Sequence, residues 1–139
     1  MITRATDYAI RVLVYMSKKK VGELSTKKEV AEQCAIPISF LAKIVQVLSK
    51  NRIINIKKGA QGGYILTKKP EDITLLEVIE LMEGRIFLNH CIKDKDVCEF
   101  YSSCIIHEMW DNLTENLRNE LKKINFKVLA EKDNCFKLK

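Results

Sequence analysis

The chain has 139 residues, 47% of them apolar, which is enough for a compact domain with a core and excludes wholesale disorder. It has no run of roughly 18–20 uncharged apolar residues, which a membrane span needs, and its first residues lack the layout of a signal peptide. We therefore expect a cytoplasmic protein with no membrane partner. The net charge of +6 is uneven, with 14 Lys/Arg against 4 Asp/Glu in residues 1–70 and 10 against 14 in residues 71–139.

The basic first half suggests a polyanionic partner, most often nucleic acid. A solvated, lysine-rich surface explains the charge equally well, so the motifs must decide between these interpretations. Helical spacing starts after Thr3, which we expect to be the N-cap of a first helix. This helix is predicted to end near the lysine run 18–20 and Gly22. Its apolar residues recur at steps of three and four: Ala5, Tyr8, Ala9, Val12, Leu13 and Met16.

Two short helices joined by a tight turn are predicted next. Thr26 and Glu29 form a capping box that opens the first of them, and Ile36-Pro37 ends it, because a residue before proline avoids helical geometry. The second helix starts around residues 37–39 and has a predicted buried stripe of Leu41, Ile44, Val45 and Leu48. This order is typical of a helix-turn-helix, whose second helix can enter a major groove.

The apolar spacing then changes to that of strands. Residues 53–58 and 64–67 flank the glycine-rich turn 59–63, which predicts a β-hairpin. The glycines could instead cradle the phosphate of a small ligand, but no helix N-terminus follows them, which disfavours a nucleotide pocket. A basic hairpin directly after a helix-turn-helix is the order of a winged helix.

The rest of the chain is predicted to contain two helices. Thr74 and Glu77 form a capping box for a short helix that stops at Gly84, and residues 85–103 have no clear periodicity. From about Cys104, apolar residues recur at steps of three and four over roughly 20 residues. They are Ile106, Met109, Trp110, Leu113, Leu117, Leu121 and Ile124. We expect this long helix to pack against its counterpart in a homodimer; the alternative is that it folds back on its own domain. The predicted fold class is mainly α with a small β-hairpin wing, a winged helix-turn-helix plus a long C-terminal dimerisation helix.

Three of the five cysteines are clustered in the pattern Cys91-x6-Cys98-x5-Cys104-x2-His107. Thiolates are the standard ligands of iron–sulfur clusters, and these wide spacings lack the C-x2-C knuckles usual in structural zinc sites. His107 lies one turn beyond Cys104 and could complete a four-ligand set. A thiol switch between Cys98 and Cys104, or no role at all, remains an alternative.

The two other cysteines are not predicted to belong to this site. Cys34 is interpreted as a small buried apolar residue and Cys135 as a thiol of the C-terminal tail. The chain also offers no convergent nucleophile and base, because both of its histidines, His90 and His107, neighbour the cysteines. We therefore do not expect an enzyme.

Together these segments resemble the Rrf-two family of winged-helix regulators, which includes the IscR and NsrR types. The resemblance covers about residues 1–130 and rests on RATDYAIRVLVYM, IPISFLAKIVQVLSK, KKGAQGGYILTKKPEDITLLEVIELMEG, the three-cysteine segment and CIIHEMW. It implies a homodimer that binds double-stranded operator DNA and carries a cluster reporting iron–sulfur supply, nitric oxide or redox state. By position, the three clustered cysteines match the cluster ligands.

The fourth ligand is left open by the resemblance. His107 matches the position that completes the IscR-type 2Fe–2S site, and Asp7 matches the first-helix carboxylate that completes the NsrR-type 4Fe–4S site from the partner subunit. We favour His107, and with it a 2Fe–2S cluster, because its local spacing needs no second chain; 4Fe–4S is the alternative. The expected organisation is a DNA-binding domain over 1–84, a cluster-binding loop over 85–104, and a dimerisation helix and tail over 105–130.

The predicted function is a DNA-binding transcriptional regulator, acting as a repressor, whose operator binding the cluster controls. A zinc-stabilised or thiol-switched DNA-binding or interaction protein without a cluster is the alternative. Lysines on the wing should contact phosphates, and the start of the second helix of the helix-turn-helix, the recognition helix, should contact bases. The predicted DNA-binding residues are Ser39, Phe40, Lys43, Lys57, Lys58, Gln61 and Gly62.

Overall fold

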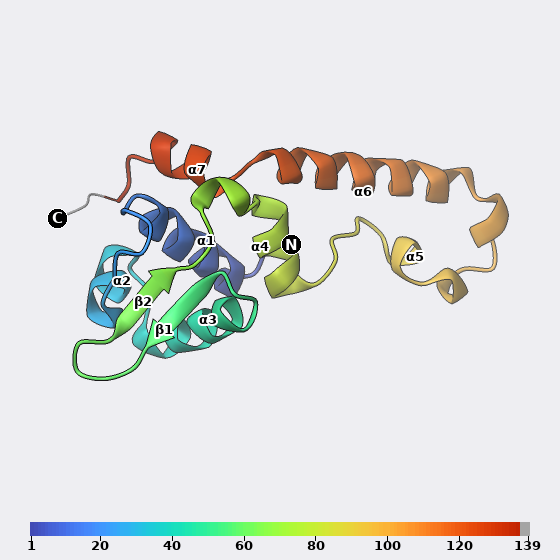
Figure 1. Ribbon diagram of the computed structural model, residues 1–139. Helices are drawn as coiled ribbons and strands as arrows, with labels where there is room; N and C mark the ends of the chain where they lie inside the picture. Colours follow the sequence, from blue (N-terminus) through green and yellow to red (C-terminus); the bar gives the residue numbers. More distant parts are fainter. Residues whose placement is uncertain (137–139) are drawn as a thin grey trace.

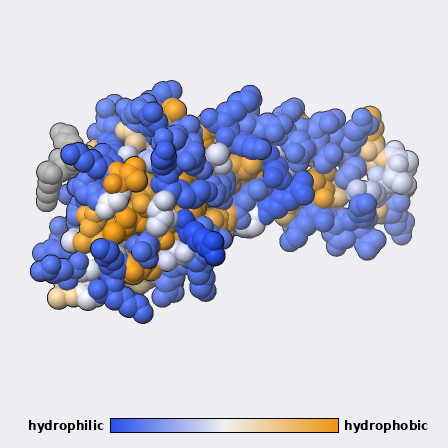
Figure 2. All heavy atoms as spheres, viewed as in Figure 1, coloured by the Kyte–Doolittle hydropathy of each residue, from blue (hydrophilic) through white to orange (hydrophobic). Residues whose placement is uncertain are grey.

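The computed structural model describes residues 1–136 as a helical body with a long projecting arm (Figure 1). The first four helices, the hairpin and the last helix form the body. The chain leaves the body after α4, runs out to α5, and returns along the long helix α6. On the face shown in Figure 2, apolar side chains gather on the body, whereas the arm is mostly hydrophilic with a few apolar side chains.

Helix α1 (Arg4–Ser17) is the central element of the body. The side chain of Thr3 accepts a hydrogen bond from the backbone N–H of Thr6, as expected of an N-cap. The helix packs against α2, α3, α4, α7 and β2. Its buried apolar side chains form the middle of the core: Ala9, Val12, Leu13, Val14, Tyr15 and Met16.

The predicted helix-turn-helix is confirmed. Helix α2 (Lys27–Gln33) has the capping box between Thr26 and Glu29. The chain turns through Ala35, whose φ of 52° is left-handed, and α3 (Ile38–Lys50) follows. The predicted stripe of α3 is buried, with Leu41 and Leu48 fully inaccessible to solvent. The body in the structure is therefore the winged helix-turn-helix that the spacing predicted.

The hairpin of the wing pairs β1 (Ile54–Lys57) with β2 (Gly63–Leu66) in antiparallel register, Ile54 opposite Leu66. Gly63 belongs to β2, whereas the sequence analysis placed it in the turn. The reason is that Gly63 pairs with Lys57 of β1. On its other side the strand is bonded to Ser25, through backbone bonds of Tyr64 of 2.8 and 2.9 Å. A Cβ on Gly63 would lie 2.3 Å from the Ser25 carbonyl oxygen, so only glycine allows this close approach.

Helix α4 (Leu75–Glu83) is capped by Thr74 and ends at Gly84, whose φ is 83°. The segment that follows, expected to be irregular, contains the short helix α5 (His90–Lys93) and two 3₁₀ turns at 95–97 and 101–103. Helix α6 (Ile105–Lys123) is the predicted long helix. Among residues 1–136, no single helix is long and apolar enough to cross a bilayer; only α2 and α3 taken together, bent by 110°, meet those criteria.

The last helix, α7 (Phe126–Lys132), was not predicted. Ile124, which the sequence analysis assigned to the stripe of the long helix, is extended and ends α6. Asn125 then caps a new helix that returns to the body, where Phe126 is fully buried in the core. Part of the stretch expected to be a dimerisation helix and tail therefore completes the core of its own subunit.

A part-buried polar network joins α1 to α2. The Glu29 carboxylate accepts hydrogen bonds from the Tyr15 hydroxyl, the Lys19 ammonium and the backbone N–H of Thr26. Burial acts to raise the pKa of Glu29, but these hydrogen bonds outweigh it and hold the pKa below its ordinary value. The network therefore stabilises the fold fully above the ordinary pKa of a glutamate, and the stabilisation is lost as the pH falls through the lower, folded-state value.

We expect Glu29→Gln to lower the free energy of unfolding at pH 7 by about 2 kcal/mol, because charge-assisted hydrogen bonds to a part-buried carboxylate are lost. The difference between variant and wild type should shrink as the pH is lowered below 4. Urea unfolding at pH 7, 5, 4 and 3 measures both quantities. Glu32→Gln, on the exposed side of α2, is the matched control; an equal effect of the two substitutions contradicts the prediction.

Candidate functional site

The outward side of α3 carries the residues predicted to contact bases. Ser39, Phe40 and Lys43 are all exposed, and 46% of Phe40 is accessible. The Phe40 ring packs edge-on against the ring of Tyr8 in α1, with centroids 5.8 Å apart. The recognition helix therefore presents its polar side to solvent while one aromatic contact ties it to α1.

The tip of the wing presents the second set of predicted residues. Lys57, Lys58 and Gln61 are exposed, and Gly62 is half-buried. A Cβ on Gly62 would lie 2.2 Å from the Lys57 carbonyl oxygen, so this turn also requires glycine. The shape of the wing thus depends on its glycines, and its lysines are free to reach a phosphate backbone.

A groove of about 400 Å³ lies between the wing and the start of α2. Lys27 and Lys28 line one side and Lys57 the other. The sequence analysis missed the two lysines of α2. Their signal was available, because they directly follow the capping residue Thr26 and so lie at the first turn of the helix that crosses the DNA backbone in a helix-turn-helix.

The clustered cysteines lie on the arm, in α5 and in the turns that lead from it to α6 (Figure 1). Cys91 is in α5, Cys98 follows the first 3₁₀ turn, and Cys104 is the N-cap residue of α6. All three are free thiols and half-buried. The Nδ1 atom of His107 is 3.5 Å from the Cys91 sulfur, so the fold brings these two predicted ligands together.

The other predicted ligands are not gathered with this pair. Within residues 1–136, no group of three or more Cys, His, Asp or Glu side chains is preformed to hold a metal ion. Asp7 is engaged on α1 itself, with its carboxylate 2.8 Å from Arg11 and 3.7 Å from Arg4. The donor types still suit an iron–sulfur cluster, because three free thiols and an imidazole lie on one short segment.

The two remaining cysteines differ from the clustered ones. Cys34 is 1% exposed, and burial raises the pKa of its thiol to about 12, so it is an inert core residue. Cys135 is exposed near the C-terminus, next to a turn in which Lys18 pairs with Asp133.

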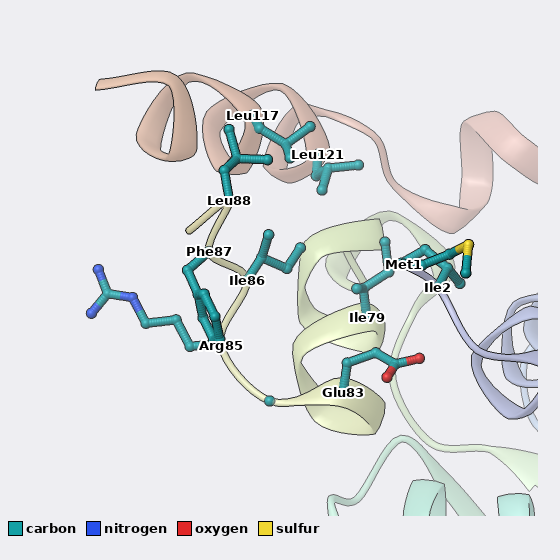
Figure 3. A pocket seen from close by; sticks show the side chains of 11 residues that line it. Met1, Ile2, Ile79, Glu83, Arg85, Ile86, Phe87, Leu88, Leu117 and Leu121 are labelled. Atoms are coloured by element: carbon teal, nitrogen blue, oxygen red, sulfur yellow. The ribbon is translucent and has the colours of Figure 1, made fainter. Parts of the chain in front are cut away.

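A cavity of about 500 Å³ lies where the N-terminus, α4, residues 84–88 and α6 meet. Its walls are mainly apolar, and Figure 3 shows Ile86 across from Ile79 of α4, with Met1 beside Ile79 and with Leu117 and Leu121 of α6 above them. The arm therefore joins the body through a loosely filled junction.

Polar contacts hold the chain at this junction. The backbone N–H of Ile86 donates to Glu80 at 3.0 Å, and that of Leu88 donates to the buried Thr114 at 3.2 Å. Arg118 of α6 is 3.2 Å from the same Glu80 carboxylate. The segment that leads to Cys91 is thus fixed to both α4 and α6.

Glu83, the last residue of α4, joins the junction to α1. It accepts hydrogen bonds from the Thr3 backbone N–H at 2.8 Å, the Thr3 hydroxyl at 2.6 Å and the Thr6 hydroxyl. These hydrogen bonds hold the pKa of Glu83 below its ordinary value, and the bond from the Thr3 hydroxyl has the largest effect. The start of α1, and through Tyr8 the recognition helix, is therefore linked to the point where the chain departs for the cysteines.

The fold defines a winged helix-turn-helix protein with exposed basic surfaces. Residues 2–132 match the model of the Rrf2 family, described as an iron-dependent transcriptional regulator. The chain therefore belongs to the Rrf2 family. This confirms the resemblance found in the sequence and the expectation that the chain is not an enzyme.

Individual relatives agree with this assignment. The HTH-type transcriptional regulator NsrR of Shouchella clausii is 32% identical over 112 residues, which are 77% of this chain and 75% of that protein. The structure of CymR, the global cysteine regulator of B. subtilis, covers 96% of this chain and 98% of its own, with a TM-score of 0.78 at 22% identity. The structure of T. potens IscR covers 100% of this chain and 93% of its own, with a TM-score of 0.69 at 19% identity. These two structures confirm the predicted fold, a mainly helical winged helix-turn-helix with a two-stranded hairpin and a long C-terminal helix.

Proposed function

We propose that this protein is a cytoplasmic, homodimeric repressor that binds operator DNA and is controlled by a cysteine-ligated iron–sulfur cluster. The observation that carries the cluster is the contact of His107 with Cys91 on a segment with two further free thiols. Membership in a family described as iron-dependent supports it, as does the similarity to a regulator named NsrR. The signal would be iron–sulfur supply, nitric oxide or redox state.

DNA binding is assigned to the outward side of α3 and to the wing. Ser39, Phe40 and Lys43 would contact base edges in the major groove, and Lys57 and Lys58, with Gln61 and Gly62 in the turn, would contact phosphates. Lys27 and Lys28 extend the phosphate-binding surface across the groove beside the wing. The division of charge along the chain supports this assignment, because all these lysines belong to its basic half.

We expect Lys58→Ala to weaken binding to every duplex sequence and to lower the salt slope by about one phosphate contact, close to 0.9 in log K against log [salt]. Fluorescence anisotropy with one selected operator and one unrelated duplex, over a range of salt concentrations, measures this slope. Lys122→Ala removes the same charge from the exposed side of α6 and should leave the slope unchanged. An unaltered salt slope in Lys58→Ala would mean that the wing lysine does not contact the DNA and that the phosphate-binding surface lies elsewhere on the protein.

The cluster would be held by Cys91, Cys98, Cys104 and His107, with Asp7 of the partner subunit as the alternative fourth ligand and 4Fe–4S as the alternative cluster. When bound, a 2Fe–2S cluster supplies an iron centre whose redox state and integrity can report a signal. The residues around the cluster would pass its state on to the DNA-binding body. Ligation would tie the cysteines of α5 and of the start of α6 to one point, and residues 85–88 connect α5 to α4.

Ligation would fix the cysteine segment against α6 and against the partner's first helix, and so change the spacing of the two recognition helices. The contacts of Glu80 with Ile86 and of Glu83 with Thr3 support a mechanical route of this kind. Coupling between two such sites is commonly 5- to 150-fold in affinity, roughly, which is large enough for a switch.

The test is to reconstitute the protein anaerobically with iron and sulfide, record its visible absorption, and measure operator binding with and without the cluster. A coloured protein with two different affinities supports the proposal. Equal affinities would remove the switch but leave DNA binding intact. A colourless, zinc-loaded protein favours the rival function, a zinc-stabilised or thiol-switched regulator, which the free thiols also allow.

A further inference from the structure

Tyr101, which the sequence analysis did not single out, contacts two of the proposed ligand positions. It begins the 3₁₀ turn that precedes α6, and its backbone N–H donates to the Cys98 carbonyl at 3.2 Å. Its ring packs on the imidazole of His107, with ring centroids 4.3 Å apart and the planes inclined by 51°. One half-buried residue thus connects the turn at Cys98 with the first turn of α6.

His107 is thereby held from two directions. Its Nδ1 atom faces the Cys91 sulfur at 3.5 Å, and its ring lies against Tyr101. An imidazole on an exposed helix surface would otherwise sample several rotamers, and restricting it lowers the entropy lost when it binds a metal. The neighbouring Phe100 is 69% exposed, so the contact belongs to Tyr101 rather than to aromatic residues of this turn in general.

We infer that Tyr101 is a positioning residue that holds His107 at the cysteine segment, so that the fourth ligand comes from the same subunit. The inference rests on the proposed function, since it concerns the ligand set of the proposed cluster. It separates the two candidate ligands on structural grounds. His107 is held beside Cys91, whereas the Asp7 carboxylate is paired with two arginines of its own helix.

The contact itself can be tested in the protein without a cluster. The chain has only two histidines, so their imidazole protons are assigned in NMR spectra with His90→Ala and His107→Ala. The ring-current shift of His107 should persist in Tyr101→Phe and Phe100→Ala and be lost in Tyr101→Ala, while the His90 resonances stay in place. An unchanged His107 shift in Tyr101→Ala overturns the inference.

The role in ligation is read from the reconstituted, reduced cluster by pulsed electron paramagnetic resonance, which detects nitrogen bound to iron. Wild type, Tyr101→Phe and Phe100→Ala should show the nitrogen coupling, and Tyr101→Ala should approach the level of His107→Ala. A wild-type cluster without nitrogen coupling overturns the inference and leaves cluster control standing. A wild-type protein that takes up no cluster overturns both, so the two failures are distinguishable.

Discussion

Replacing Cys98 with alanine is expected to abolish cluster assembly while the winged-helix body stays folded. Cys98 is half-buried on the arm and does not belong to the buried core, so its loss removes a ligand and little packing. Iron and sulfide content after anaerobic reconstitution should fall to background, and the visible absorption should disappear. Far-ultraviolet circular dichroism and the thermal midpoint should match those of wild-type protein without a cluster.

The same variant should lose the control of DNA binding. In wild type, we expect operator affinities with and without the cluster to differ by about 5- to 150-fold, and in Cys98→Ala a single affinity equal to that of the cluster-free form. Cys135→Ala removes an exposed thiol near the C-terminus and should behave as wild type. If Cys98→Ala retains full iron and sulfide, Cys98 is not a ligand and the proposed set is wrong.

Local signals predicted most of the fold correctly because each acts over a few residues. The capping box at Thr26 set the start of α2, and the left-handed φ of Gly84 ended α4. At the start of α4 Thr74 caps the helix as predicted, but the box is incomplete, because the Glu77 carboxylate pairs with Lys68 instead. Helix α7 was missed because Ile124 fits the apolar spacing of α6, and only the cap formed by Asn125 separates the two helices. The chain turns back after α6 because Phe126 is buried in the core of the body, and this long-range contact has no local signal.

The candidate site was predictable in its parts and not in its arrangement. The spacing grouped the three thiols with His107, but nothing in the sequence indicated that Cys91 is the thiol His107 would contact or that Tyr101 packs on His107. Those contacts depend on how the chain folds back between α5 and α6, and this part of the sequence has no periodic pattern. The ion pair of Glu80 with Arg118 was equally unpredictable, because these residues are 38 positions apart in the sequence.

The exposed side of α6 carries an apolar stripe that its own subunit leaves uncovered. Ile106, Met109 and Leu113 are 56%, 45% and 44% exposed, and Leu117, 38% exposed, lies where this stripe meets the cavity beside α4. The opposite side of the helix contacts α4 through Arg118. The fold-back alternative therefore accounts for only one side of α6. A continuous apolar face on a projecting helix is the kind of surface that a second copy covers in a symmetric dimer.

Leu113→Glu is therefore expected to convert the protein to a monomer and to weaken operator binding by about 100-fold or more, because two linked recognition helices bind with far higher effective concentration than one. A charge in the middle of an apolar interface loses its hydration without gaining a partner. Sedimentation velocity at micromolar protein gives the oligomeric state, and anisotropy titration gives the affinity.

Asn119→Glu adds the same charge to the same helix, away from the stripe, and should remain dimeric with wild-type affinity. Because Leu113 is 44% exposed in the subunit and does not belong to the buried core, its substitution should leave the fold of the monomer intact, and the circular dichroism of the two variants should agree. A Leu113→Glu protein that stays dimeric would assign the interface to another surface. A wild-type protein that is monomeric yet binds its operator tightly would show that no dimer interface is needed. It would also contradict the proposal that the cluster acts by setting the distance between two recognition helices.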